Sequence, residues 1–143
     1  MKLQSILQDK GGAVVTIGDN ETLLEAARIL DSNKIGAAVA TDSKGKVTGV
    51  LSERDIVRRV AQYGADALNI PVSEAMTRDV VTAPQDMSVE EGLERMTDRR
   101  IRHLPIVNQG ELIGIVSIGD LVKRKISVAE TEAEALKQYI HAG

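Results

Sequence analysis

The same spacing of apolar positions occurs twice along this chain, 66 residues apart. Positions 23, 26, 27 and 30, and again 89, 92, 93 and 96, carry apolar or small residues spaced i, i+3, i+4 and i+7. That spacing places each set on one face of a helix. Thr22 with Glu25, and Ser88 with Glu91, precede the two sets and match the capping box that starts a helix. The sequence therefore predicts two equivalent amphipathic helices.

Each predicted helix is followed by two short apolar segments separated by a polar turn. This order is typical of a strand, a hairpin turn and a returning strand. The returning strand leads into a further helix, which starts at Ser52 in the first repeat and at Ser117 in the second. A short apolar strand comes before each of the two amphipathic helices, so the predicted order of each unit is β-α-β-β-α. The apolar segments of the hairpins are residues 36–40, 47–52, 103–107 and 112–117.

A short amphipathic segment precedes each unit, because residues 3, 6 and 7 have the apolar spacing of residues 72, 75 and 76. A unit of three strands and two helices cannot bury both faces of its sheet alone. We therefore predict an α/β (α+β) fold in which two pseudo-symmetric units pack through their sheets, with a C-terminal helix added. The predicted parts are residues 1–70, which include the N-terminal segment and a linker, residues 71–125, and a helical tail at residues 126–143.

Composition narrows the range of functions. The chain has 143 residues and a formal net charge of −3, contains no Trp or Phe, and has two Tyr. We therefore expect no nucleic-acid partner, since basic surface and stacking rings are both scarce. The absence of Cys excludes disulfides and Cys-based metal sites. No segment resembles a signal peptide or a membrane span, so we expect no membrane contact and a cytoplasmic location.

Candidate catalytic groups are also scarce. The two histidines are His103 and the near-terminal His141, so no Ser/His/Asp set can be drawn, and no phosphate-loop or dinucleotide fingerprint occurs. A metal site would have to consist mostly of carboxylates. We expect a protein that is not an enzyme and has no metal and no catalytic cofactor.

Two heptapeptides occupy equivalent places in the repeats, Gly-Val-Leu-Ser-Glu-Arg-Asp at 49–55 and Gly-Ile-Val-Ser-Ile-Gly-Asp at 114–120. Together with Arg-His-Leu-Pro-Ile-Val at 102–107, they resemble a tandem pair of CBS (cystathionine-β-synthase-type) motifs, also called a Bateman module. The resemblance covers nearly the whole chain, which is similar to small stand-alone bacterial CBS-pair proteins. It implies a regulatory module that binds adenine nucleotides in clefts between the motifs and senses energy or redox state. AMP is the first choice, and NAD(H) or ATP are alternatives.

The resemblance also implies roles for individual residues. In the family, the aspartate after the last strand of each motif binds the ribose hydroxyls, which corresponds here to Asp55 and Asp120. The serine three residues earlier lines the same pocket. First-strand threonines lie beside the adenine or the phosphate, and the strand after the first helix contacts the base. The positions implied are Ser52 and Ser117, Thr16 and Thr82, and Ile35, Gly36, Ala37, Ala38, Arg102, His103, Leu104 and Pro105.

The chemistry of these residues agrees with the resemblance. A carboxylate can accept hydrogen bonds from two vicinal hydroxyls, and the helix starts supply free amides and a positive dipole end for an anion. Ser-x-x-Asp is also an ordinary helix cap that needs no ligand, and the two roles are compatible. Cations for a phosphate would be Arg54, Arg100, Arg102 and His103, with Lys34 a weaker candidate.

The two predicted clefts differ in charge. The second repeat has Arg102 and His103 where the first has Gly36 and Ala37. We therefore expect the cleft that contains Asp120 to bind a monophosphate such as AMP, with Arg54 reaching across from the other motif. The smaller lining of the first repeat leaves room for a larger ligand such as NAD(H) or ATP.

The apolar residues of the tail follow the 3.5-residue period of a coiled-coil seam. The tail either packs back on its own module or forms a dimer contact, and we expect a homodimer that this helix assists. The protein target is unknown. The alternative function is a structural or protein-interaction module whose clefts are vestigial or hold a non-nucleotide ligand. The seam positions are Val122, Ile126, Ala129, Ala133, Leu136 and Ile140.

Overall fold

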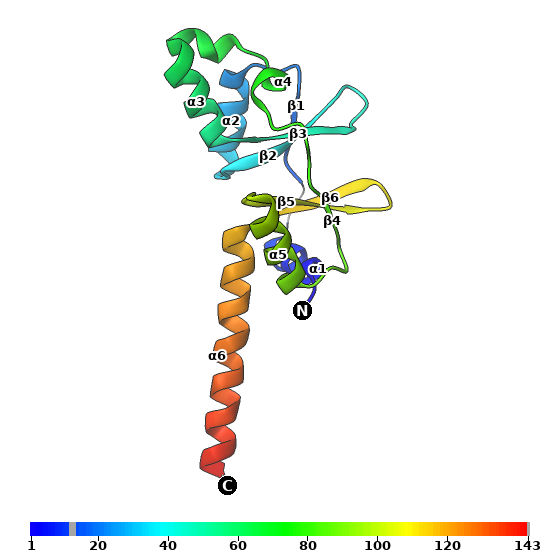
Figure 1. The fold of residues 1–143 in the computed structure, drawn as a ribbon, viewed down its shortest axis with the longest axis vertical. Helices are drawn as coiled ribbons and strands as arrows, with labels where there is room; N and C mark the ends of the chain where they lie inside the picture. Colours follow the sequence, from blue (N-terminus) through cyan, green and yellow to red (C-terminus); the bar gives the residue numbers. More distant parts are fainter. Residues whose placement is uncertain (12–13, 143) are drawn as a thin grey trace.

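Each repeat forms a three-stranded sheet flanked by helices, in a computed structural model that describes residues 1–11 and 14–142 (Figure 1). The first unit contains β1 (Thr16–Gly18), α2 (Leu23–Asn33), β2 (Ala37–Thr41), β3 (Val47–Ser52), α3 (Glu53–Tyr63) and the 3-10 helix η1 (Gly64–Asn69). The second contains β4 (Ala83–Pro84), α5 (Val89–Arg99), β5 (His103–Asn108), β6 (Glu111–Ser117) and α6 (Ile118–Ala142). Two short helices, α1 (Leu3–Lys10) and α4 (Val72–Ala75), precede the units along the chain and are called the leading helices below.

The predicted capping boxes start α2 and α5. Thr22 Oγ1 accepts a hydrogen bond from Glu25 N at 3.2 Å, and Ser88 Oγ accepts one from Glu91 N at 3.1 Å. Ser88 Oγ also donates to the Glu91 carboxylate at 3.0 Å, which fixes that side chain over the first turn. These bonds satisfy amides that have no partner inside the helix.

The two sheets have the same topology. In each, the short first strand runs parallel to the middle strand, which pairs antiparallel with the last, giving the orders β1-β2-β3 and β4-β5-β6. The middle strand β2 is buried on both faces. Ala38 and Ala40 belong to the core of the first unit, whereas Ala37 and Val39 point the other way and are also buried. The second sheet lies on that side, so the units pack through their sheets as predicted (Figure 1).

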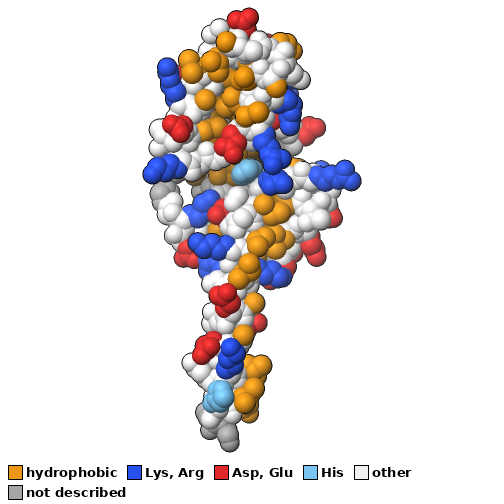
Figure 2. Space-filling view, turned by 90° about the vertical axis from the view of Figure 1, so that its left-hand side faces the viewer, with side chains coloured by type: hydrophobic (Ala, Val, Ile, Leu, Met, Phe, Trp, Pro, Cys, Tyr) orange, Lys and Arg blue, Asp and Glu red, His pale blue; other side chains and the backbone are white. Residues whose placement is uncertain are grey.

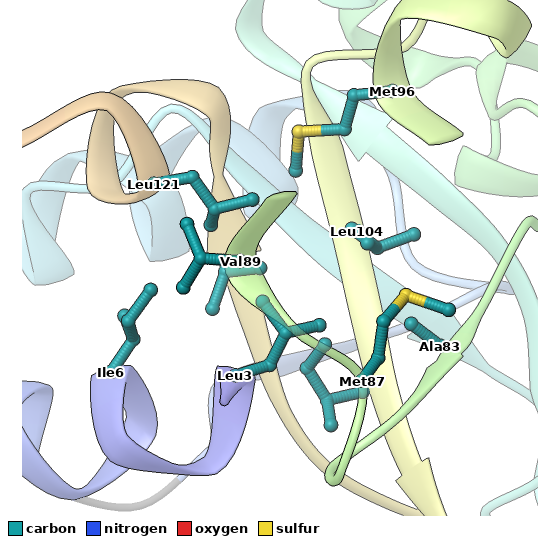
Figure 3. Packing of buried hydrophobic residues seen from close by; sticks show 10 residues of the cluster. Leu3, Ile6, Ala83, Met87, Val89, Met96, Leu104 and Leu121 are labelled. Atoms are coloured by element: carbon teal, nitrogen blue, oxygen red, sulfur yellow. The ribbon is translucent and has the colours of Figure 1, made fainter. Parts of the chain in front are cut away.

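The leading helices are exchanged between the units. Leu3 and Ile6 of α1 lie in the core of the second unit, among residues such as Leu104 and Leu121 (Figure 3). Val72 and Ala75 of α4 lie in the core of the first unit. Each helix therefore closes the core of the unit that it does not directly precede.

Backbone hydrogen bonds fix the exchange at both ends. Leu3 N donates to Met87 O at 2.8 Å, and Val89 N donates to Met1 O at 3.0 Å. At the other end, Val72 N donates to Glu21 O at 2.8 Å. The predicted boundary at residue 70 is a division along the chain and stays a prediction, but in space the two leading helices lie across it.

Two equivalent glycines admit the leading helices. A Cβ placed on Gly114 of β6 would lie 2.5 Å from Leu7 Cδ2, and one placed on Gly49 of β3 would lie 2.5 Å from Met76 Sδ and 2.8 Å from Thr77 O. A side chain on Gly49 would meet the backbone at Thr77 just after α4, whereas one on Gly114 would force the Leu7 side chain to move. The glycine that begins each of the two heptapeptides is thus explained by packing.

Candidate functional site

Two clefts lie where the units meet, and each contains one of the equivalent aspartates. The Asp55 cleft has a volume of about 400 Å³ and is lined by Ser52 and Asp55, among others. The Asp120 cleft has a volume of about 470 Å³ and is lined by Ser117 and Asp120, among others. Both volumes fall within the ~300–1,000 Å³ that is usual for small-molecule sites.

Each cleft is built from both units. In the Asp55 cleft, Asp55 belongs to the first unit, whereas Arg100 and Arg102 belong to the second. In the Asp120 cleft, Asp120 belongs to the second unit and Ile35 to the first. A ligand in either cleft would therefore contact both units at once.

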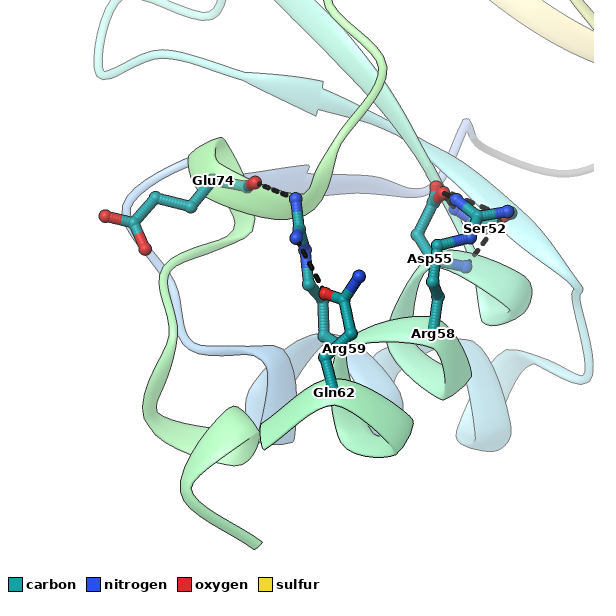
Figure 4. A network of polar contacts seen from close by, with 6 residues as sticks. All are labelled: Ser52, Asp55, Arg58, Arg59, Gln62 and Glu74. Carbon is teal, nitrogen blue, oxygen red and sulfur yellow. Dashed lines mark hydrogen bonds and ion pairs between the residues drawn. The ribbon is translucent and has the colours of Figure 1, made fainter. Parts of the chain in front are cut away.

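Asp55 is held at the start of α3 by a capping box. Its Oδ2 accepts hydrogen bonds from Ser52 N at 2.9 Å and Ser52 Oγ at 3.1 Å, while Asp55 N donates to Ser52 Oγ at 3.3 Å. The other oxygen, Oδ1, is paired with the exposed Arg58 guanidinium at 3.3 Å (Figure 4). An exposed pair contributes at most about 1 kcal/mol. Oδ1 can therefore exchange Arg58 for a ligand hydroxyl at little cost.

Three arginines line the Asp55 cleft, Arg54, Arg100 and Arg102. Within residues 1–11 and 14–142, no ion pair engages any of them. Glu53 and Asp79 also line this cleft, so its charge is mixed. Figure 2 shows Lys and Arg side chains gathered around the waist of the molecule, with acidic side chains among them. Unpaired guanidinium groups are well suited to phosphate oxygens, which they can bind in a bidentate manner.

Arg100 occupies an unusual backbone conformation at the C-terminal end of α5. Its φ and ψ of 54° and 44° lie in the left-handed region, and the equivalent Lys34 after α2 has φ 55° and ψ 44°. Glycine is the usual residue at such an end, because a side chain there costs about 1 kcal/mol. Arg100 lines the Asp55 cleft, whereas Lys34 is exposed and belongs to the described lining of neither cleft.

In the Asp120 cleft, the carboxylate is already engaged by a lysine. Lys10 Nζ donates to Asp120 Oδ2 at 2.8 Å and to Ile115 O at 3.1 Å, and Ser117 N donates to the same Oδ2 at 2.8 Å. Burial raises the pKa of Asp120, but the hydrogen bonds from Lys10 and Ser117 outweigh it, so the pKa lies below its usual value. Asp120 is therefore ionised at neutral pH, and Lys10 balances its charge.

His103 lines both clefts. Burial lowers the pKa of its imidazole, and the nearby positive charges of Lys10 and Arg102 lower it further, while Asp120 and Glu53 oppose the change. His103 is therefore neutral at pH 7 and offers a hydrogen bond to a ligand instead of a positive charge.

The exchange of the leading helices brings unpredicted residues into the clefts. Because α1 closes one unit and β1 belongs to the other, the segment between them must cross the junction, and the segment after α4 crosses in the same way. Lys10 and Asp79 are equivalent, since each stands seven residues after the first apolar residue of its leading helix. That equivalence was visible in the sequence. The end of α1 and the described residues after it supply Lys10, Gly11, Val14 and Val15 to the Asp120 cleft, and the segment after α4 supplies Thr77, Asp79, Val80 and Val81 to the Asp55 cleft.

Most of the residues implied by the family resemblance line a cleft. In the Asp55 cleft they are Gly36, Ser52, Arg54, Asp55, Arg100, Arg102, His103 and Pro105. In the Asp120 cleft they are Ile35, Gly36, Ala37, His103, Ser117 and Asp120.

Five of the implied residues fall outside the described linings of both clefts. Ala38 and Leu104 are fully buried in the cores of their own units. Thr16 and Thr82 each lie one residue beyond a lining valine, and the Thr82 carbonyl accepts a hydrogen bond from Arg95 at 2.7 Å. Lys34 is the fifth. A nucleotide-binding role for these five stays a prediction that the linings do not support.

The cations are distributed differently from the expectation. Arg102 was expected to favour phosphate binding in the Asp120 cleft, with Arg54 reaching across to it, but both arginines line the Asp55 cleft. The expectation was wrong because the strand that follows α5 faces the aspartate of the other unit. In the Asp120 cleft, the described lining contains Lys10 and His103 as its basic residues.

Comparison with known proteins shows the family to which this chain belongs. The model of the CBS domain family matches residues 12–62 and again residues 72–127. A CBS domain-containing protein of Bacillus subtilis (strain 168) is 37% identical over 128 residues, covering 90% of this chain and 89% of that protein. The chain belongs to the CBS domain family and carries its domains as a tandem pair.

Solved structures share the fold. A CBS-domain containing protein from Agrobacterium tumefaciens has 44% identity and a TM-score of 0.82, with 87% of this chain and 92% of that chain covered. A CBS domain protein from Pyrobaculum aerophilum, complexed with AMP, has 32% identity and a TM-score of 0.75, with 84% and 89% covered. The tandem pair and the mixed α/β fold predicted from the sequence are confirmed.

Among the described residues, no group of three or more His, Asp or Glu side chains is placed to hold a metal ion. No helix in the same part of the chain is both long and apolar enough to cross a membrane.

The Lys10–Asp120 pair predicts a pH effect. In Lys10→Met, the Asp120 pKa should rise, because the variant loses the hydrogen bond and the charge that hold it down. The folded-state pKa of Asp120 is depressed, so the stability from this pair is present above the unfolded value and is lost as pH falls through the folded pKa. Wild type should exceed the variant in stability at neutral pH by no more than about 1 kcal/mol, since Lys10 is half exposed, and the difference should vanish in acid.

Carboxyl NMR titration of Asp120, with thermal unfolding at several pH values, checks this prediction. Lys34→Met is the matched control, because Lys34 is also exposed and lies outside the described linings. An Asp120 pKa that is equal in wild type and Lys10→Met would show that the ion pair does not form in solution.

Proposed function

We propose that this chain is a regulatory module that binds an adenine nucleotide in the Asp55 cleft, with AMP as the first-choice ligand. The observation that carries the proposal is the lining of that cleft, which combines a fixed carboxylate with three arginines. The complex of the Pyrobaculum aerophilum relative with AMP supports the ligand class. The cleft offers a contact for each part of the nucleotide.

The ribose would bind to Asp55. Two vicinal hydroxyls are donors, and an ionised carboxylate can accept from both. The capping box with Ser52 fixes the carboxylate before any ligand arrives, so little side-chain freedom is lost on binding. The hydroxyls would replace Arg58 at Oδ1.

The 5′-phosphate would bind to the arginines. Arg54 belongs to the first unit, whereas Arg100 and Arg102 belong to the second. A phosphate between them would neutralise positive charges on both units and favour the arrangement that brings them together. A ligand can regulate only if it binds one arrangement better than another, and this contact provides such a difference.

The base would lie on the apolar part of the same cleft. Val80, Val81 and Ile101 line it beside the segment that leads into β5. His103 can add a neutral hydrogen bond. An adenine ring, which is flat and has polar edges, fits an apolar lining of this kind.

The Asp120 cleft favours a different role. Its carboxylate is already bound by Lys10, and its described lining contains no arginine. The alternative that a cleft is vestigial or holds a non-nucleotide ligand therefore fits the Asp120 cleft better than the Asp55 cleft. Displacing Lys10 would be the first requirement for any ligand there.

The module would bind its ligand without converting it, and it would be a cytoplasmic homodimer. Occupancy of the Asp55 cleft would change how the module interacts with a protein target. ATP and NAD(H) are the competing ligands in the same cleft. Hydrolysis of a bound nucleotide by the pure protein would contradict the binding-only role.

A matched pair of variants tests which cleft binds AMP. Asp55→Asn should weaken AMP binding about tenfold or more, because a hydrogen bond to a charged group is lost, whereas Asp120→Asn should leave the Kd unchanged. Both substitutions alter the same capping box in equivalent helices, so their effects on folding are comparable. Isothermal titration of wild type and both variants with AMP, adenosine, ATP and NADH measures the Kd of each ligand. Adenosine should bind more weakly than AMP because it lacks the phosphate.

Loss of AMP binding in Asp120→Asn with no change in Asp55→Asn would contradict the choice of cleft. No binding of any of these ligands to wild type would contradict the nucleotide function and favour the interaction module.

A second pair of variants separates strain from ligand binding. Arg100→Gly and Lys34→Gly should each gain up to about 1 kcal/mol in stability, because glycine adopts the left-handed conformation without strain. Only Arg100→Gly should weaken AMP binding. Chemical denaturation and AMP titration check both effects, and equal AMP affinity in the two variants would remove Arg100 from the site.

A further inference from the structure

The C-terminal half of α6 projects away from both units (Figure 1). The helix contacts α5, α1 and β6 near its start, where Leu121 is fully buried. Every residue from 129 to 141 is exposed. A free helix of about a dozen residues is marginal in water, and the like charges of Glu130 and Glu134, one turn apart, weaken it further. This part of α6 therefore needs a partner.

One face of α6 is apolar along its whole length. The apolar residues, called the seam below, are spaced 4, 3, 4, 3 and 4, and Ile126, Leu136 and Ile140 are 54%, 60% and 63% exposed. In Figure 2 an apolar stripe continues from the body of the molecule down the projecting helix. A period of 3.5 residues is the one that keeps a seam facing a second helix. The seam consists of Val122, Ile126, Ala129, Ala133, Leu136 and Ile140.

The seam faces to one side of the body to which α6 is attached. Leu121, Arg124 and Lys125 face that body, where Arg124 pairs with Asp9 and Lys125 with Glu90. At about 100° per residue, the seam lies roughly a quarter turn around the helix from this side. A second helix can therefore lie along the seam without displacing α1 or α5. If a twofold axis runs along the seam between two copies of α6, the body of the second copy lies on the opposite side of the helix pair from the first.

We propose that α6 forms a parallel two-stranded coiled coil with α6 of a second copy of this chain. Charge selects the parallel direction. With Ile126, Ala133 and Ile140 at a positions, Lys125 is at g and Glu130 is at the e position five residues later, where g meets e of the other helix. Glu132 and Lys137 are spaced in the same way. A parallel pair thus has attractive contacts on both sides of the seam.

An antiparallel pair would be less favourable. If it covered the whole seam, Ile126 would face Leu136 of the second copy, and e positions would meet e positions while g positions met g positions. Glu130 would then oppose its own copy, and so would Glu132. Moving the register by one heptad relieves this repulsion but leaves part of the seam exposed.

This coiled coil would be the interface of the homodimer proposed above, and its formation does not depend on nucleotide binding. A parallel coil would hold the two bodies at the same end of the seam, side by side. A chain that binds AMP as a monomer would overturn this inference alone, and a dimer that binds no nucleotide would overturn the ligand proposal alone.

Cysteine crosslinking tests the direction directly, because the natural chain has no Cys. Ile126→Cys and Ile140→Cys, as two separate variants of the full chain, should each form a disulfide-linked dimer under mild oxidation. In an antiparallel pair only the residue at the crossing point can face its own copy, so at most one of the two could crosslink. Gln138→Cys, on the outer face of the helix, is the control and should not crosslink.

Sedimentation equilibrium of wild type and two charge variants tests the driving contacts. Glu130→Lys should raise the dimer Kd roughly tenfold, because it places lysine opposite Lys125. Glu134→Lys makes the same charge change at an outer position and should have a smaller effect. A monomeric wild type, crosslinking of only one of the two seam cysteines, or of neither, or equal effects of the two charge variants would overturn the inference.

Discussion

The exchange of the leading helices completes both hydrophobic cores and holds the two units together. A three-stranded sheet with two helices leaves part of its core open, and each core is closed by the helix that precedes the other unit. Leu3 is fully buried in the second unit, and Val72 is fully buried in the first. Gly114 and Gly49 allow the close approach that this packing requires. Neither unit therefore has a complete core without the other.

The clefts follow from the same exchange. Described residues at the end of α1 and after each leading helix line the clefts beside the aspartates. Lys10 at the end of α1 and Asp79 after α4 occupy equivalent positions but carry opposite charges. Lys10 neutralises Asp120, whereas Asp55 is left with a weak surface pair and lies near arginines that form no ion pair within the described part of the chain. A symmetric fold thus produces two clefts of different chemistry.

Local pattern in the sequence predicted the elements well. The capping residues Thr22 and Ser88, the hairpins and the repeat were correct, because each depends on residues close together in the chain. The pairing of residues across the junction could not be predicted in this way. Arg102 was expected beside Asp120 of its own unit, although it lines the Asp55 cleft, because nothing local in the sequence shows which aspartate the strand after α5 faces. Lys10 was missed because nothing local shows which unit a leading helix packs against.

If AMP binds in the Asp55 cleft and contacts both units, as we propose, AMP should change amide hydrogen exchange on both sides of that cleft. In the full chain, AMP should slow exchange at residues 52–55 in the first unit together with residues 77–81 and 100–103 in the second, and leave residues 115–120 unchanged. Protection confined to one unit, or centred on residues 115–120, would rule out this binding mode.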